Sequence, residues 1–94
     1  MAKDVKISDH ARKKYKERCK GKYDFKKLVS NCNGIRKGLR TVTRVSHYKN
    51  TYSAKYCYFD YNENLVFVFS NTMNRLLTVR NDLSHFNIIN DKKI

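Results

Sequence analysis

A change of periodicity after Gly38 divides this chain into a helical first part and a β-strand second part. Before Gly38, apolar residues recur at intervals of three and four, which is typical of amphipathic helices. After it, apolar and polar residues alternate, as they do in half-buried strands. The sequence therefore predicts an α+β fold, with two N-terminal helices packed on one face of an approximately four-stranded antiparallel sheet.

Both predicted helices carry end signals. Ser8 and Asp24 are residues that cap helix N-termini, because their side-chain oxygens accept hydrogen bonds from the first unpaired backbone N–H groups. Gly21 and Gly34 are placed to end the same helices in left-handed turns. The predicted helices span residues 8–20 and 25–33.

The strands are predicted within residues 39–81. The run "LVFVFS" at 65–70 is apolar on both faces and indicates a central strand, whereas "LSHFNII" at 83–89 fits either a short strand or a helix. The residues expected in or near the core are Leu65, Phe67, Val68, Leu77 and Val79.

Ninety-four residues are enough for one domain with a single core, so residues 1–94 are expected to fold as one unit. The ends, residues 1–6 and 90–94, are expected to fray. No run approaches the ~20 apolar residues that span a bilayer, and the N-terminus lacks the apolar stretch of a signal peptide. A cytoplasmic location, including the cytoplasm of a host cell, is the expectation, with no membrane partner.

The net charge of +13 is concentrated in the first half of the chain. Residues 1–50 hold 16 Lys and Arg against 4 acids, and residues 51–94 hold 5 against 4. Such a field attracts polyanions, which indicates a nucleic acid, with RNA favoured, or an acidic protein surface as partner. Solubility is the alternative explanation, although acidic and scattered charges serve it better.

Neither a metal nor a cofactor is predicted. The three cysteines form no C-x-x-C pair and are read as reduced thiols. His10, His47 and His85 are far apart in the sequence, so a metal site has little support. Phosphate-binding glycine loops, nucleophile elbows and paired carboxylates are also missing from the sequence.

His10, Lys14 and Arg18 follow one another at four-residue steps, so they share one stripe of the first helix. The functional interpretation is a phosphate-facing trio, since an imidazole exchanges protons near neutrality and an arginine holds a phosphate with two hydrogen bonds. The alternative, favoured by spacing alone, is that His10 merely occupies the first helical turn while Lys14 and Arg18 are solvated.

A second candidate surface is a row of tyrosines. Tyr52, Tyr56 and Tyr58 share one face of the predicted second strand, and Arg40 and Arg44 share a face of the strand before it. Aromatic rings interleaved with cations stack bases in single-stranded RNA binders. The alternative is that the helices cover this face, and the sequence does not decide which face is buried.

The segment "ISDHARKKYKER" resembles the N-terminal helix of a family of small prokaryotic and phage proteins known as DUF4258. The matching residues are His10, Ala11, Glu17 and Arg18, with Lys14 where the family more often has arginine. The order of two helices and then a meander ending in "LLTVR" is also similar to the RelE-like ribonuclease fold, which includes RNA-cleaving toxins.

The RelE-like resemblance implies cleavage of RNA by its own 2′-hydroxyl, for which the protein supplies a base, an acid and cations. It assigns proton exchange to His10 or Tyr56, and phosphate binding to Arg18, Arg44 and Arg80.

Two functions are therefore compatible with the sequence. The first is a small basic RNA-directed protein of RelE-like type, either a metal-independent ribonuclease or a relative that only binds RNA. The alternative is a phage-like inhibitor that docks on an acidic surface of a host protein such as RNA polymerase or a nuclease. The residues expected to contact nucleic acid are Lys14, Arg40, Arg44, Tyr52 and Tyr58.

Overall fold

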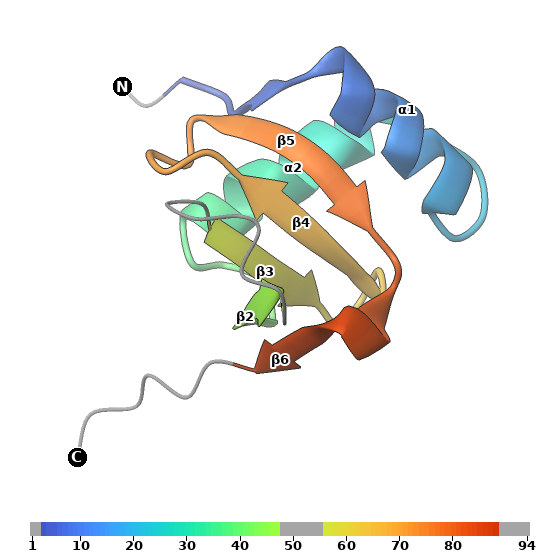
Figure 1. Ribbon diagram of the computed structural model, residues 1–94. Helices are drawn as coiled ribbons and strands as arrows, with labels where there is room; N and C mark the ends of the chain where they lie inside the picture. The colour runs from blue at the N-terminus through green and yellow to red at the C-terminus, as the bar shows by residue number, and fades with distance from the viewer. Residues whose placement is uncertain (1–2, 48–55, 89–94) are drawn as a thin grey trace.

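The computed structural model describes residues 3–47 and 56–88. Figure 1 shows α2 behind the sheet, α1 beside the β5 edge, and the C-terminal elements returning from β5 towards β2. The elements are β1 (Lys6–Ile7), α1 (Asp9–Arg18), α2 (Phe25–Arg36), β2 (Val42–His47), β3 (Tyr56–Asp60), β4 (Leu65–Phe69), β5 (Arg75–Arg80), the 3-10 turn η1 (Leu83–His85) and β6 (Phe86–Ile88).

The α+β class and the order of helices before the main strands are confirmed, but the predicted sheet is wrong in two respects. It has six strands in the order β1-β5-β4-β3-β2-β6, and it is mixed because β1 pairs with β5 in parallel. Fraying of residues 1–6 does not hold for Val5, which is buried, or for Lys6, which begins β1. A two-residue strand is too short to show a periodicity, so β1 cannot be predicted from the sequence pattern.

The segment 83–89, whose sequence fits either a short strand or a helix, contains a helical turn followed by a strand. Leu83–His85 is a single 3-10 turn, and Phe86–Ile88 is β6, which pairs antiparallel with β2. Residues 89–94, which include all of the predicted C-terminal fray, lie outside the described part.

The predicted caps are confirmed. The Ser8 side chain accepts a hydrogen bond from the Ala11 N–H at 3.0 Å, and the Asp24 side chain accepts from the next helix. Gly21 has a φ of 68°, so it does turn the chain in the left-handed region. However, α1 ends at Arg18, two residues earlier than predicted.

Gly34 does not end α2, which continues to Arg36. A Cβ at Gly34 would lie 2.9 Å from Cγ of Arg40, which is closer than real contacts. Gly34 therefore leaves room for the Arg40 side chain to cross the helix and reach the sheet. The left-handed residue after α2 is Gly38, with a φ of 74°.

The helices cover the sheet face that carries the tyrosines. Tyr56 and Tyr58 pack against the main core cluster, whereas Cys57 and Phe59 belong to a smaller cluster on the other face. The main cluster combines both helices with the sheet and consists of Val5, Ala11, Tyr15, Leu28, Cys32, Ile35, Leu65, Phe67, Phe69, Leu76 and Val79.

All five residues of β4 are buried, so the central strand is confirmed as apolar on both faces. Of the predicted core residues in β5, Val79 is buried but Leu77 is only half-buried. The pairing of β4 with β5 shifts between Val68 and Phe69, so that Phe69 faces Leu76. This irregularity, which strict alternation cannot predict, moves Leu76 into the core in place of Leu77.

The turn between β3 and β4 holds a buried carboxylate at its first residue. Asp60 is fully buried, and its Oδ1 accepts hydrogen bonds from the backbone N–H groups of Asn62 and Glu63 at 2.8 and 3.2 Å. Its Oδ2 accepts from Nε of Arg40 at 2.6 Å. Asp60 therefore fixes the turn and ties the segment after α2 to the sheet.

Glu63, the other buried carboxylate of this turn, connects to both helices. It accepts hydrogen bonds from Asn31 Nδ2 of α2 at 3.2 Å and from the Tyr15 hydroxyl of α1 at 3.4 Å, and Lys27 Nζ lies 3.3 Å away. Burial is the main cause that raises the pKa of Tyr15, and the nearby Glu63 carboxylate adds to it. The phenol therefore remains a hydrogen-bond donor throughout the neutral range.

Replacement of Asp60 is expected to destabilise the fold in a graded way. Asp60→Ala leaves the Arg40 guanidinium and two turn N–H groups without their acceptor, which should lower the free energy of unfolding by about 3 kcal/mol. Asp60→Asn keeps an acceptor for the turn and loses only the ion pair, so it should fall between Asp60→Ala and the parent.

Urea denaturation measures these differences. Asp9→Ala is the matched control, because it removes an exposed carboxylate whose contact with Arg12 is 3.8 Å long, and its midpoint should equal the parent's. Equal midpoints for Asp60→Ala and Asp9→Ala would contradict the role given to Asp60.

Candidate nucleic-acid interface

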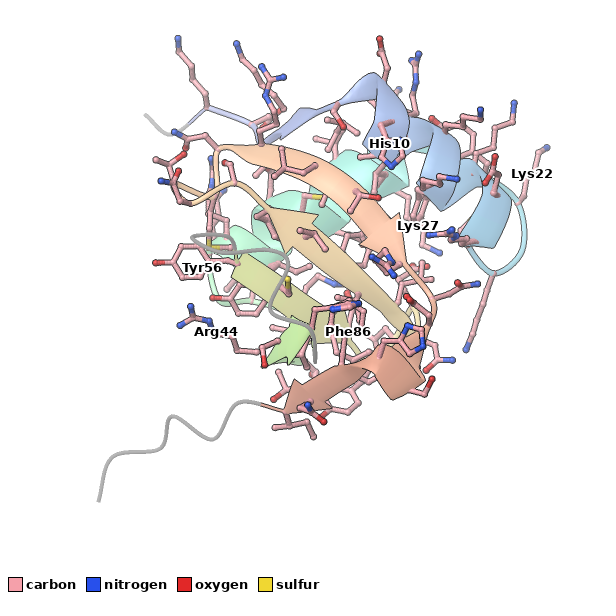
Figure 2. All side chains as sticks on the ribbon, viewed as in Figure 1. His10, Lys22, Lys27, Arg44, Tyr56 and Phe86 are labelled. Atoms are coloured by element: carbon pink, nitrogen blue, oxygen red, sulfur yellow. The ribbon has the colours of Figure 1, made fainter. Side chains whose placement is uncertain are left out.

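Most cations of the helical part are directed to solvent. Figure 2 shows them projecting from α1 and from the loop that follows it, where Lys22 is labelled. The exposed cations from α1 to the first turn of α2 are Arg12, Lys13, Lys16, Lys20, Lys22, Lys26 and Lys27. Since the acids nearest to them are few, this side of the molecule presents a positive field to a polyanion.

The predicted stripe on α1 is divided between different environments. His10 is exposed, and the half-buried Lys14 lies 3.6 Å from the Glu17 carboxylate. Arg18 instead donates a hydrogen bond through Nη1 to the backbone carbonyl of Val79 at 2.6 Å. Arg18 thus has a structural contact with the sheet, and its predicted catalytic role and the RNA contact of Lys14 stay predictions.

The Arg18 contact belongs to a set by which α1 covers the edge of β5. The Ser8 backbone N–H donates to the Leu76 carbonyl, and the Ser8 hydroxyl donates to the Leu77 carbonyl, each at 3.1 Å. These bonds occupy edge groups that could otherwise pair with a foreign strand.

Arg40 and Arg44, predicted to share a basic strand face, are used differently. Arg40 precedes β2 and is engaged by Asp60, with one fifth of its side chain exposed. The Arg44 guanidinium lies over the Tyr56 ring, 4.5 Å from its centroid, and Arg44 is opposite Tyr58 in the β2–β3 pairing. Figure 2 places Tyr56 and Arg44 together at the sheet end distant from His10.

Arg44, Tyr56 and Tyr58 therefore form a partly exposed cation and aromatic patch at the margin of the helix-covered face. The patch offers a ring and a guanidinium plane, both of which stack on bases. Tyr52, the remaining member of the predicted tyrosine row, lies outside the described residues.

Five side chains meet at the end of β5, and we call them the histidine cluster. They belong to Arg80, Asp82, His85, His47 and Phe86. Asp82 is held by Arg80, whose Nε donates to Oδ1 at 3.0 Å and whose Nη2 donates to Oδ2. His85 Nδ1 lies 3.0 Å from the same Oδ2. The His47 ring is 5.9 Å from that of His85 and 5.2 Å from that of Phe86, edge to face in both cases.

Burial of the Asp82 carboxyl acts to raise its pKa, but hydrogen bonds from Arg80, its own backbone and His85, together with the Arg80 charge, outweigh that effect and lower it. Asp82 is therefore a carboxylate at neutral pH. It can orient both the guanidinium and the imidazole beside it, as carboxylates do for catalytic or metal-binding histidines.

Strand pairing brings His47 and His85 together. After β5 the chain turns through Asp82, and β6 then pairs with β2 so that His47 is opposite Phe86. His47 and His85, which are far apart in the sequence, are thus neighbours in the fold. The spacing of Arg80, Asp82 and His85 after a strand could have drawn attention to three members, whereas His47 joins only through the long-range pairing.

The residues predicted to be catalytic do not converge in one place. Arg80 is opposite Val66 in the smaller core cluster, whereas Arg44 is opposite Tyr58 on the helix-covered face. The two arginines therefore lie on opposite faces of the sheet. His10, at the start of α1, is also remote from Phe86 in Figure 2.

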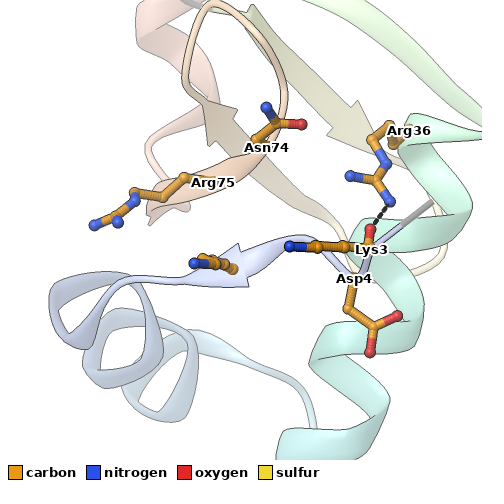
Figure 3. A pocket seen from close by; sticks show the side chains of 6 residues that line it. Lys3, Asp4, Arg36, Asn74 and Arg75 are labelled. Carbon is orange, nitrogen blue, oxygen red and sulfur yellow. Dashed lines mark hydrogen bonds between the residues drawn. The ribbon is translucent and has the colours of Figure 1, made fainter. Parts of the chain in front are cut away.

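A further basic feature is a cavity of about 460 Å³ between the N-terminal segment, α2 and the start of β5. Figure 3 shows its lining, in which Arg36 donates a hydrogen bond to the Lys3 carbonyl. Lys3, Lys6, Arg36 and Arg75 surround it with Asp4 as the one acid, so it extends the positive surface to this end of the molecule.

Comparisons with protein-family models, curated proteins and solved structures find no match to this chain. The DUF4258-like and RelE-like resemblance accordingly stays an expectation from the sequence. Across residues 3–47 and 56–88, neither helix has the length and apolar character needed to cross a membrane.

Removal of the Arg18 guanidinium should destabilise the protein. Arg18→Ala breaks a charged hydrogen bond to a strand-edge carbonyl, and the expected loss is about 1.5–3 kcal/mol in urea denaturation. Lys14→Ala is the matched control on the same helix, because it removes only a surface ion pair worth ~1 kcal/mol or less. Arg18→Ala as stable as the parent would show that the contact with Val79 contributes nothing.

Proposed function

We propose that this chain is a small basic RNA-directed protein that cleaves RNA without a metal ion, at the histidine cluster. The observation that carries the proposal is the convergence of His47, His85 and Arg80 around the Asp82 carboxylate. Two imidazoles beside a cation provide the base, the acid and the positive charge that cleavage through a 2′-hydroxyl requires. The RelE-like resemblance of the sequence supports the same reaction class.

In the proposed reaction, one imidazole accepts the proton of the 2′-hydroxyl while the 2′-oxygen attacks the adjacent phosphorus. The bond from phosphorus to the 5′-oxygen breaks, and the other imidazole, protonated, gives its proton to that leaving oxygen. The products are a 2′,3′-cyclic phosphate and a 5′-hydroxyl. Arg80 stabilises the charge that develops on the phosphorane oxygens, and Asp82 positions Arg80 and His85.

The basic surface would bring RNA to this centre. Arg18 fixes the end of α1 at Val79, the residue before Arg80, so the cations of α1 and its following loop continue towards the cluster. The patch of Arg44 and the two tyrosines lies on the other face of the sheet, and it would stack bases of an RNA that continues round the β6 edge, at ~1–3 kcal/mol per base. Binding should weaken steeply with salt, because each neutralised phosphate of a single strand releases about 0.7 counterion.

Cleavage is tested with an end-labelled RNA oligonucleotide in the presence of EDTA. The parent should give fragments ending in a 2′,3′-cyclic phosphate, and His47→Ala or His85→Ala should slow their appearance by ~10² to 10⁴ while binding is retained. The same oligonucleotide with 2′-deoxy sugars should bind and remain intact, because it lacks the nucleophile.

His10→Ala decides between the cluster and the α1 stripe predicted from sequence. Loss of cleavage in His10→Ala with full activity in His47→Ala and His85→Ala would overturn the assignment to the cluster. RNA that is retarded in a native gel but never cleaved would indicate that the protein binds RNA without cutting it. RNA that is neither bound nor cut would favour the inhibitor of an acidic host surface.

A further inference from the structure

We infer that His47, Asp82 and His85 form a binding site for one divalent transition-metal ion of the zinc, nickel and copper class. Each residue offers one ligand atom, and these atoms all lie within 4.8 Å of one another. The inference concerns the free protein and does not require that RNA be bound or cleaved.

The distances suit a shared ion after small side-chain rotations. Two ligand atoms that each bind one ion at about 2.0–2.2 Å are themselves roughly 3 Å apart. The separation of His85 Nδ1 from Asp82 Oδ2 is already 3.0 Å. The His47 ring must come closer, from a ligand-atom separation that lies within 4.8 Å.

The backbone holds the ligands in place. The His85 N–H donates to the Asp82 carbonyl at 3.0 Å within η1, which keeps these two side chains on one side of the turn. His47 is fixed by the register that pairs it with Phe86. A site that spans a tight turn and a neighbouring strand is preorganised, so little ordering is required when the ion binds.

The donor set selects the kind of ion. Imidazole nitrogen suits zinc, nickel, copper and cobalt, whereas magnesium and calcium prefer sites made only of oxygen ligands. Three protein ligands leave at least one coordination position for water or for an oxygen of a bound anion.

Arg80 competes with the ion, because its guanidinium donates two hydrogen bonds to the carboxylate that the ion would use. The Asp82 carboxylate can therefore bind either the Arg80 guanidinium or the metal ion. If the proposed cleavage is correct, an ion bound by His47 and His85 would leave neither imidazole able to accept a proton, and cleavage would be suppressed.

Isothermal titration of the full chain with zinc chloride, without RNA or chelator, tests the site. One equivalent should bind, His47→Ala and His85→Ala should each weaken binding at least tenfold, and magnesium chloride should give no saturable heat. Arg80→Gln removes the competing cation and should tighten binding severalfold. Titration with cobalt chloride should add visible absorption bands of a nitrogen- and oxygen-ligated ion.

His10→Ala is the matched control, since it removes an exposed histidine remote from the cluster, and it should bind zinc as the parent does. Cys19→Ser tests the partly exposed thiol as an alternative ligand. The proposed site would be contradicted if the parent showed no saturable zinc binding or if Cys19→Ser abolished binding. It would also be contradicted if His10→Ala and His85→Ala weakened binding equally. Because this titration contains no RNA and the cleavage assay contains EDTA, either proposal can fail without the other.

Discussion

β4 is buried on both faces, and the rest of the structure follows from the need to cover each face. On one side, α1 and α2 supply Ala11, Tyr15, Leu28 and other apolar residues. On the other, Leu83 and Phe86 from the C-terminal elements pack on Val66 and Val68. That second cover requires β6 to return across the sheet to β2, and the return places His85 beside His47. The histidine cluster is thus a consequence of how the second face is buried.

The polar core matters because the chain carries a net charge of +13, and self-repulsion of that size opposes compaction. Two of the eight acids, Asp60 and Glu63, are buried where they attract cations from the segments packed on the sheet. Asp60 forms an ion pair with Arg40, and Glu63 forms one with Lys27. Glu63 also accepts hydrogen bonds from the Tyr15 hydroxyl and the Asn31 amide. Most of the other cations within residues 3–47 and 56–88 are exposed, where a polyanion can reach them.

The features that could be predicted from sequence are those set by local chemistry. Ser8 and Asp24 cap their helices because a cap needs only the next three residues, and β4 is recognisable because no other strand is apolar throughout. The features that were missed depend on distant contacts. β1 exists only through its pairing with β5, α2 passes Gly34 only because Arg40 needs the space, and His47 meets His85 only through β6.

The sequence alone also does not decide whether the helices cover the sheet face that carries the tyrosines. Alternation places Tyr56 and Tyr58 on one face and Cys57 and Phe59 on the other, but both sets are apolar enough to be covered. The choice is made by the helices, which cover the tyrosine face and leave the second face to Leu83 and Phe86, from a segment whose sequence fits either a short strand or a helix. The helix stripe and the tyrosine row predicted from sequence lie on the helix-covered side, whereas the histidines converge on the opposite one, where Arg80 is the one predicted site residue among them.

The central claim is that the return of β6 to β2 brings His47 and His85 into contact, and a nuclear Overhauser spectrum of the free protein tests it most directly. With both imidazoles assigned, the account predicts cross-peaks between the His47 ring protons and those of His85 and Phe86, matching ring separations of 5.9 and 5.2 Å. A well-folded protein in which His47 shows cross-peaks to neither ring would contradict the account.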